Sequence, residues 1–415
     1  MYIDRMKQII SNKKFHLNLF IIYSIIIITL IPLKSILDPQ IFGEDEVLTY
    51  LVNINLLDHL SNYNLKGFLS ELIKDWHPPG RNLFSLLSIS VLGENITSLR
   101  IPYYILWICT CVLGILITKK FTDTVSCYIC VTLLAGSGLF HIQTMGFGHG
   151  FISFIGMLVI YLITNKNWFN YNEFSTRKFI YISILLYIGF LFFNTLILIT
   201  MMLHFIQLFL ILRSADRTIH IYKFFLVSSF ISVFYIMYFI IFLGLPMLMV
   251  NSADFLMFLK TNFNIYNFGN WKGENFGQLH QYIHRSELAK LNIISFIENI
   301  KYLNWHFYPF LSLLIIIFSF FILNKSFKII LFLILPYFLI TNFYMFGNTG
   351  QHFASLFIWL IPFFSIATHR LKINSYSKKF ICILIICLMI PFTLFAHIKS
   401  YNETNYPYKI VNNVN

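Results

Sequence analysis

Charge is scarce in this chain. Asp, Glu, Lys and Arg make up 11% of its 415 residues, whereas 58% are hydrophobic and the mean hydropathy is +0.72. Soluble globular proteins carry roughly 25% charged residues, so the composition excludes that class. Apolar runs of about 17–22 residues recur, long enough to cross a bilayer as helices and unlike the alternation of a membrane β-barrel. The sequence therefore predicts an all-α polytopic membrane protein.

Acidic residues are scarcer than basic ones: 17 Asp and Glu stand against 30 Lys and Arg, for a net charge of +13. Such a balance is also found in nucleic-acid-binding proteins. Here, however, the basic residues stand at the ends of apolar runs and form no single stripe. Membrane topology explains them better, so we expect the lipid bilayer as a partner and no nucleic acid.

The cysteines and the N-terminal segment predict no disulfide, no metal site and no cleaved signal peptide. All the cysteines fall inside apolar runs (Cys109, Cys111, Cys127, Cys130, Cys382 and Cys387). Cys127 and Cys130 have metal or redox spacing, but no His or acid stands beside them, so we expect a packed pair with no disulfide and no metal. The first apolar run starts near Phe15 behind several basic residues and lacks a small-residue cleavage site. It predicts a retained helix whose N-terminus is cytoplasmic.

The apolar runs predict a bundle of about 11 transmembrane segments. Spanning helices are expected near 16–33, 101–118, 125–140, 147–164, 222–243, 306–323, 328–344, 352–368 and 380–397. Residues 178–212 form two shorter runs interrupted at Asn194 and Thr195, which predicts a paired or broken hairpin. The short run 82–92 could either span or be re-entrant or interfacial.

The distribution of Lys and Arg favours the second alternative for 82–92. With that choice, most of the basic residues lie in the inside segments 1–15, 119–124, 165–178, 213–223, 324–328 and 369–379. Only four acids share those segments (Asp4, Asp123, Glu173 and Asp216). The interval 34–100, the turns near His149 and Gln351, and the loop 244–305 then lie outside. The sequence predicts a multi-pass plasma-membrane protein with its chemistry on the external face, which is the periplasmic side of the inner membrane in a Gram-negative cell and the outer surface of the plasma membrane in a Gram-positive one.

Three regions follow from this topology. Residues 1–243 are expected to form a catalytic transmembrane module that includes the first external loop, 34–100. Residues 244–305 form a second external loop, in which aromatic residues mix with Asn, Gln and Gly. That mixture suits sugar recognition, although an interfacial aromatic belt would have a similar composition. Residues 306–415 complete the chain with further helices and an external tail.

The first external loop concentrates acids, a histidine and an arginine in a chain otherwise poor in charge. After Asp45 and Glu46, apolar residues recur at helical spacing (Val47, Leu48, Leu51, Ile54, Leu57 and Leu60) and polar ones occupy the other side (Asn53, Asn55 and Asp58). The pattern predicts an amphipathic helix lying along the membrane interface. The two acids suit the positive end of that helix, and they could also be ordinary capping residues.

The second half of the loop contains His77-Pro78-Pro79 and, further on, a glycine turn before Arg100. Paired prolines stop one helix and preset the start of the next, which holds His77 and Arg81 at fixed positions. Arg100 falls in the first turn of the following helix, where the helix dipole disfavours a cation, so we expect it to have a partner.

The order of these residues resembles that of a known class. Asp45-Glu46 after the first apolar helix, then His77-Pro78-Pro79, then Leu92-Gly93 and Ser98-Leu99-Arg100-Ile101-Pro102 look like lipid-linked glycosyltransferases of the GT-C class. The similar groups are the dolichyl-phosphate-mannose protein mannosyltransferases and the lipid A aminoarabinose transferases. The motif similarity covers roughly the first 165 residues. The chain departs from the group where Arg-x-Tyr and Arg-Tyr are often found: it has His149-Gly150-Phe151 and Gln351-His352-Phe353.

The resemblance implies an enzyme, an inverting glycosyltransferase of the cell envelope. Its sugar donor would be a polyprenyl-phosphate-linked sugar, and its acceptor a glycolipid, polysaccharide or protein. Asp45 is the candidate general base, with Glu46 orienting acceptor or base. The donor phosphate would be bound by residues that can donate hydrogen bonds (His77, Arg81, Arg100, His149 and His352). A divalent cation held by Asp45 and Glu46 is an open alternative.

Plainer roles exist for the same residues. His77 could cap the Pro-Pro turn, Arg81 and Arg100 could reach lipid headgroups, and His149 could be a helix-end histidine. Two other functions also fit a polytopic chain: an O-antigen-type polysaccharide polymerase, and a transporter or flippase. A polymerase would be expected to use arginines in late loops. A transporter would carry internal repeats and charges deep in the bundle, whereas this chain has almost none within its apolar runs.

Overall fold

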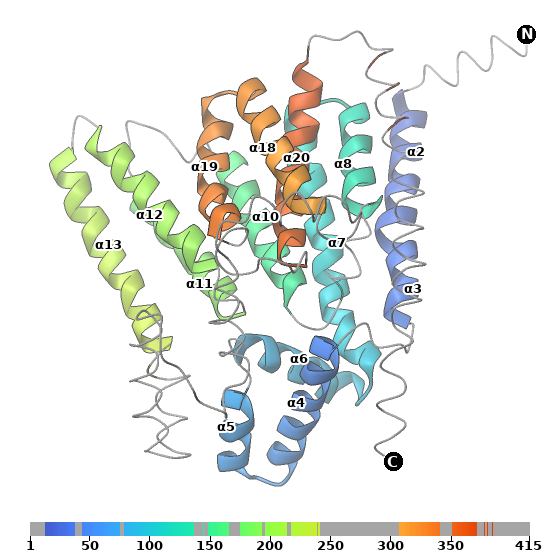
Figure 1. Cartoon of the computed structure of the whole chain (residues 1–415), viewed down its shortest axis with the longest axis vertical. Helices are drawn as coiled ribbons and strands as arrows, with labels where there is room; N and C mark the ends of the chain where they lie inside the picture. Colours follow the sequence, from blue (N-terminus) through green and yellow to red (C-terminus); the bar gives the residue numbers. More distant parts are fainter. Residues whose placement is uncertain are drawn as a thin grey trace, which may run out of the picture.

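The computed structural model describes residues 13–37, 44–74, 79–136, 144, 148–165, 175–192, 196–213, 217–238, 240, 307–340, 351–371, 377, 380 and 384. In these ranges the chain forms helices and turns, and no strand occurs among them. The all-α prediction is thus confirmed for the described part. Figure 1 shows most of the helices side by side in a bundle, with the helices formed by residues 44–92 at one end.

The helices of the bundle stand close to where the apolar runs place them. They are α2 (Lys13–Ile25), the π-helical turn η1 (Ile26–Leu30), α3 (Ile31–Leu37), α7 (Ile96–Phe121), α8 (Thr124–Gly136), α10 (His149–Asn165), α11 (Thr176–Phe190), α12 (Leu196–Leu212), α13 (Arg217–Tyr238), α18 (Phe307–Ile322), α19 (Lys325–Ile340) and α20 (Gln351–Arg370). The run interrupted at Asn194 and Thr195 is the pair α11 and α12, which pack against each other. The span expected at 380–397 and the loop 244–305 lie outside the described residues, apart from positions 380 and 384.

Length and composition distinguish these helices. Ile96–Phe121 and Thr218–Tyr238 are, among the described residues, the two helices long and apolar enough to cross a membrane by those measures alone. Shorter apolar helices also occur: Leu17–Leu30, Thr124–Ala135, His149–Thr164, Leu196–Leu212 and Ser312–Ile322. The predicted number of about 11 spans therefore stays a prediction.

The centre of the bundle is formed by α7, α10 and α20, with α8 and α18 beside them (Figure 1). Trp359 of α20 is fully buried and packs where Gly156 of α10 leaves room, because a Cβ at Gly156 would overlap its indole ring. The indole Nε1 donates to the carbonyl of Ser153 at 3.1 Å, and Ser153 Oγ donates to Ser355 Oγ at 2.8 Å. This close contact fixes the register of α10 against α20.

The N-terminal helix is pinned to the same core. Pro32, the second residue of α3, cannot donate a backbone N–H, and the π-helical turn η1 ends two residues before it. Tyr104 of α7 donates its hydroxyl to the carbonyl of Thr29 in this turn at 2.9 Å. Tyr23 of α2 shares a hydrogen bond of 2.7 Å with Thr132 of α8. These two bonds attach η1 to α7 and α2 to α8.

Large apolar side chains cover the outer surface of the bundle. On α13 they recur along one face (Ile219, Tyr222, Phe225, Leu226, Phe230, Val233, Ile236 and Met237), each at least 43% exposed. Water would disfavour so much exposed apolar surface, whereas hydrocarbon would not. The surface is of the kind that a bilayer covers.

Three helices stand apart from the bundle: α4 (Glu44–Ser61), α5 (Leu65–Lys74) and α6 (Pro79–Leu92). Figure 1 places them together at the end where α3 finishes and α7 begins. Leu56, Leu72 and Leu86, one from each helix, form a buried cluster. The short run 82–92 thus belongs to a helix at the end of the bundle, packed on α4 and on the start of α7.

Candidate active site

The first turn of α4 carries the two predicted catalytic acids. The helix begins at Glu44, so Asp45 and Glu46 stand at its positive end, as the sequence predicts. The side chain of Asp45 lies outside the described part of the structure. Glu46 is buried, with 1% of its surface exposed. A carboxylate so deeply buried needs a cationic partner.

That partner is Arg100, in the first two turns of α7. Arg100 Nε donates to Glu46 Oε1 at 2.8 Å, and Nη2 donates to Oε2 at 2.7 Å. Both side chains are buried, at 1% and 0% exposure. The two parallel bonds use the planar fork of the guanidinium and fix its orientation as well as its position. The pair locks the start of α4 to the start of α7.

The side of α4 that faces the protein is polar. Glu46, Thr49, Asn53 and Leu56 are buried, and Asn53 Nδ2 donates to the carbonyl of Thr49 at 2.7 Å. The helix is where the sequence predicts it, and Asn53, from the predicted polar side, is buried in the protein. Leu51 and Leu60, from the predicted apolar side, are 50% and 48% exposed. Each predicted side of α4 therefore contains both buried and exposed residues: Asn55 and Asp58 are exposed like Leu51 and Leu60, whereas Leu56 is buried like Asn53.

Hydrogen bonds join α4 to the rest of the end group. Asn55 Nδ2 donates to Glu71 Oε1 of α5 at 3.0 Å. Tyr50 donates its hydroxyl to the carbonyl of Glu94 at 3.2 Å. Burial, followed by the negative charge of Glu94, raises the pKa of Tyr50 above its ordinary value, so the hydroxyl stays protonated as a donor. Each bond crosses from α4 to a different segment of the loop.

Helix α6 presents its first turns to the interior. It begins at Pro79, which confirms that the paired prolines preset a helix start. Gly80 N donates to the carbonyl of Leu191, just after α11, at 3.0 Å. A Cβ at Gly80 would overlap that carbonyl, so glycine is required for the approach. Arg81 and Asn82 follow and are buried, at 2% and 0% exposure.

An aromatic cluster holds α6 in this position. The ring of Phe84 makes edge contacts with Tyr103, Phe151 and Phe192, at centroid distances of 5.7, 5.8 and 5.6 Å. Tyr103 in turn shares a hydrogen bond of 3.1 Å with Ser85. Because these contacts come from α7, α10 and the residues after α11, they position the buried arginine of α6 relative to three other helices.

Arg81 lies beside the start of α10. Gly148 has a φ of +104°, which favours glycine, and a Cβ there would lie 3.4 Å from Arg81 Cδ. The next residue, His149, is fully buried. Ser355 lies in α20, one helical turn after His352. Its Oγ donates to the carbonyl of His149 at 3.3 Å. The two histidines that depart from the class pattern therefore stand in first turns of helices that pack together, although the side chain of His352 is outside the described structure.

The structure brings together only part of the predicted set. Glu46 and Arg100 pair directly, and Arg81 runs alongside the residue before His149. His77 lies outside the described residues. Asn53, Asn82 and Tyr103 are buried polar groups at this end that the sequence reasoning did not select. The spacing of Glu46, Thr49 and Asn53 along one side of α4 was the available signal, since it repeats at helical period.

The metal prediction stays untested. Within the described ranges, no group of three or more His, Cys, Asp or Glu residues is placed to hold a metal ion. Both carboxylate oxygens of Glu46 accept hydrogen bonds from Arg100. As it stands, Glu46 serves as the anchor of Arg100.

Comparison with known proteins places the fold. No family model and no curated protein sequence matches the chain. The crystal structure of ArnT from Cupriavidus metallidurans in the apo state is similar in fold, with a TM-score of 0.53 at 11% sequence identity. The match covers 88% of this chain and 62% of ArnT, so the chain spans less than two thirds of that protein's length. The fold resemblance to the aminoarabinose transferase group, predicted from the order of motifs in the first loop, is confirmed.

Proposed function

We propose that this chain is an inverting GT-C glycosyltransferase that moves a sugar from a polyprenyl-phosphate donor to an acceptor at the external membrane face. The observation that carries the proposal is the lock between Glu46 and Arg100. It holds the acid-bearing first turn of α4 at the end of a bundle whose fold is shared with ArnT. The exposed apolar surface of α13 supports a membrane location.

Asp45 is the proposed general base. It precedes Glu46 in the same helical turn, so the bidentate bond to Arg100 fixes the backbone that carries it. As the acceptor oxygen or nitrogen attacks the anomeric carbon, Asp45 takes the proton and the bond to the lipid phosphate breaks with inversion. Holding the base in one place lowers the entropic cost of that step. Glu46 and Arg100 are then positioning residues, which refines the roles predicted from sequence.

Arg81, His149 and His352 are the proposed phosphate-binding residues, with His77 as a further candidate. Helices α6, α10 and α20 all begin at the end of the bundle that holds α4 (Figure 1). Helix N-termini favour anions because their first N–H groups and dipoles point outward. Arg81 adds a permanent positive charge beside the start of α10. Together these groups would stabilise the charge that develops on the leaving phosphate.

The membrane orientation belongs to the proposal. At the opposite end of the bundle, basic residues lie in the first or last turns of the helices (Lys119, Lys120, Lys325, Lys328 and Arg370). Cytoplasmic loops are enriched in Lys and Arg. This supports a cytoplasmic position for that end and an external one for α4–α6, where lipid-linked sugars and their acceptors would meet.

The test compares wild-type protein with Asp45→Asn by mass spectrometry of co-purified lipids. A catalytic base acts after binding, so we expect Asp45→Asn to retain a polyprenyl-phosphate monosaccharide that wild type turns over. Asp58→Asn is the matched control, because Asp58 is an exposed acid of the same helix that accepts a bond from Asn62. It should behave as wild type.

Three results would contradict the proposal in whole or in part. Absence of any prenyl-phosphate lipid from both wild type and Asp45→Asn would remove the donor assignment. Retention of a diphosphate-linked oligosaccharide would favour the polysaccharide polymerase instead. Equal accumulation in Asp45→Asn and Asp58→Asn would separate the donor from the base: the lipid would be bound, but Asp45 would have no specific role.

A further inference from the structure

The end of the bundle opposite α4–α6 carries a group of cations that converge on one pair of aromatic rings. Phe121, the last residue of α7, and Phe327 of α19 stack edge-on at 4.9 Å. Lys120 Nζ lies 5.4 Å from the ring centre of Phe121, and the guanidinium of Arg370 lies 5.5 Å from that of Phe327. Three helix ends thus place two cations over adjoining rings.

Other basic side chains surround this pair. Lys328, one residue after Phe327, lies 4.8 Å from the ring of Phe320. Lys119 and Lys325 are exposed beside them. The preference for basic residues in cytoplasmic segments explains why cations occur at this end. It does not explain why two of them, on α7 and α20, lie over two rings that contact each other, with a third cation over a ring of α18.

The cations are held in place by the protein. Lys120 Nζ donates to the carbonyl of Thr164, in the last turn of α10, at 3.0 Å. Phe327 is buried and also contacts Phe363 of α20, at 5.9 Å between ring centres. An arginine lying over a ring keeps its N–H donors at the edge of the guanidinium plane, where they can reach an anion. The group is therefore more ordered than isolated surface lysines would be.

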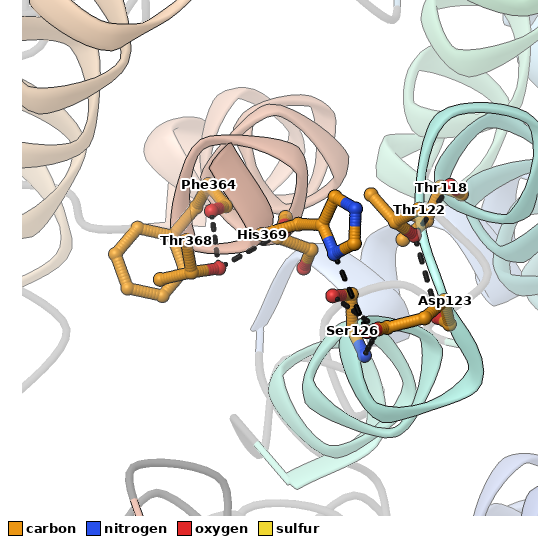
Figure 2. A network of polar contacts seen from close by, with 8 residues as sticks. Thr118, Thr122, Asp123, Ser126, Phe364, Thr368 and His369 are labelled. Atoms are coloured by element: carbon orange, nitrogen blue, oxygen red, sulfur yellow. Dashed lines mark hydrogen bonds and ion pairs between the residues drawn. The ribbon is translucent and has the colours of Figure 1, made fainter. Parts of the chain in front are cut away.

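One acid stands at this end among the described residues, and its contacts are local. Asp123 accepts hydrogen bonds from Ser126 N at 3.0 Å and Ser126 Oγ at 2.9 Å, which cap the start of α8. Its other oxygen lies 3.4 Å from His369 Nδ1. Figure 2 shows Asp123 between the α7–α8 turn and the end of α20. The net charge around the two rings therefore stays strongly positive.

Exposed apolar side chains lie next to the cations, on the same helices but closer to the middle of the bundle. Leu116 and Val112 stand one and two turns before Lys120 on the same ridge of α7, at 42% and 44% exposure. Phe332 stands one turn after Lys328 on α19, at 44% exposure. A ligand that fits both features carries a phosphate and, next to it, hydrocarbon chains.

We propose that Lys120 and Arg370, which lie over Phe121 and Phe327, form together with Lys328 a binding site for the phosphodiester headgroup of an anionic phospholipid. The phosphate lies among the cations and the acyl chains lie along Leu116 and Phe332. Basic groups between helix ends bind anionic headgroups in this way at membrane surfaces. The site depends on the membrane setting of the proposed function and not on its chemistry.

The experiment measures lipid retention by the full-length protein. Delipidated protein in detergent is mixed with equal amounts of phosphatidylglycerol and phosphatidylcholine that have identical acyl chains, and bound lipid is counted by native mass spectrometry. Wild type should prefer phosphatidylglycerol. The triple variant Lys120→Gln, Lys328→Gln, Arg370→Gln should lose that preference by about tenfold. Because Lys120 also caps α10, the charge-conserving variant Lys120→Arg, Lys328→Arg, Arg370→Lys is measured in parallel and should retain it.

The matched control removes the same charge elsewhere at the same end of the bundle, by Arg177→Gln, Lys178→Gln and Arg213→Gln on α11 and after α12. Retention in this control supports the site. An equal loss in both triple variants, loss in the charge-conserving variant, or no preference in wild type would overturn it. Displacement of the lipid by millimolar inorganic phosphate would identify a site for small anions instead. Asp45→Asn should bind phosphatidylglycerol as wild type does, so this result is independent of the glycosyltransferase proposal.

Discussion

Two ion pairs, one at each end of the bundle, join α7 or the turn after it to another helix. Glu46 and Arg100 meet through two bonds of 2.8 and 2.7 Å and are almost fully buried. Asp123 and His369 meet through one contact of 3.4 Å, with side chains 47% and 30% exposed. The first pair must remain matched, because neither charge can be hydrated alone. The second is open to solvent and has a single long contact, so it contributes little.

The difference extends to the surroundings of each pair. Around Glu46 and Arg100, the polar groups of α4 and α6 are turned inward (Thr49, Asn53 and Asn82). Around Asp123 and His369, the charged side chains are turned outward at the ends of α7, α19 and α20. One end thus holds polar groups away from solvent. The other is built to present positive charge to what surrounds the protein.

The largest expected effect comes from removing one member of the buried pair. Arg100→Met leaves the carboxylate of Glu46 buried without its partner and should lower the free energy of unfolding by about 3–5 kcal/mol. Unfolding in detergent, followed by circular dichroism against temperature or added denaturing detergent, measures the loss. The double variant Glu46→Leu, Arg100→Met should recover much of it, because both charges are gone.

The double-mutant cycle decides whether the two residues act as one unit. Strong coupling is expected, with the loss in the double variant well below the sum of the two single losses. Additive losses in the free energy of unfolding would show that the two residues stabilise the fold independently and not as a pair. Arg100→Lys keeps the charge but cannot form the two parallel bonds, so it should fold and yet transfer sugar more slowly, with kcat affected more than KM.

The next effect concerns the approach of α6 to the turn after α11. Gly80→Ala places a Cβ against the carbonyl of Leu191 and should cost about 1–3 kcal/mol, because backbone cannot move aside as a flexible side chain would. Arg81, the next residue, would shift with α6, so activity should fall along with stability. Ser90→Ala, at an exposed position of the same helix, is the control. If the two variants have the same free energy of unfolding, the close contact at Gly80 does not require glycine for stability.

The sequence predicts the positions of the helices well, because each helix follows from the length of its own apolar run and from the residues that bound it. Pro79 starts α6 and the break at Asn194 separates α11 from α12, as expected. His204 of α12 has its Nδ1 2.8 Å from the carbonyl of Thr200, one turn earlier in the same helix. These are local properties, decided by residues a few positions apart.

The orientation of α4 could not be predicted in the same way. Its polar residues occupy more than one side, so periodicity alone does not say which side faces the protein. The deciding contact is that of Glu46 with Arg100, which lies 54 residues further along the chain. The sequence did indicate that Arg100 needed a partner, since a cation in the first turn of a helix is disfavoured. It did not indicate that Glu46 would be that partner, which requires the start of α4 to lie against the start of α7.

A smaller effect is expected at the exposed end from the cap of α8. Asp123→Ala removes the acceptor of the bonds from Ser126 N and Oγ and should cost about 1 kcal/mol, the usual value of an N-cap. Asp123→Asn keeps the side-chain oxygen but loses the charge, so it should cost less. Thermal unfolding of the two variants separates the cap from the ion pair. Equal losses would assign the effect to the charge and contradict the capping role.

The smallest effect is expected from His369→Gln. The side chain is 30% exposed and its contact with Asp123 is single and long, so its loss should change the free energy of unfolding by about 0.5 kcal/mol or less. Raising the salt concentration should reduce even that difference, because exposed charges are screened. A loss of about 2 kcal/mol or more, unaffected by salt, would mean that solvent does not reach this pair. The two ends would then differ in the number of bonds in their ion pairs and not in burial.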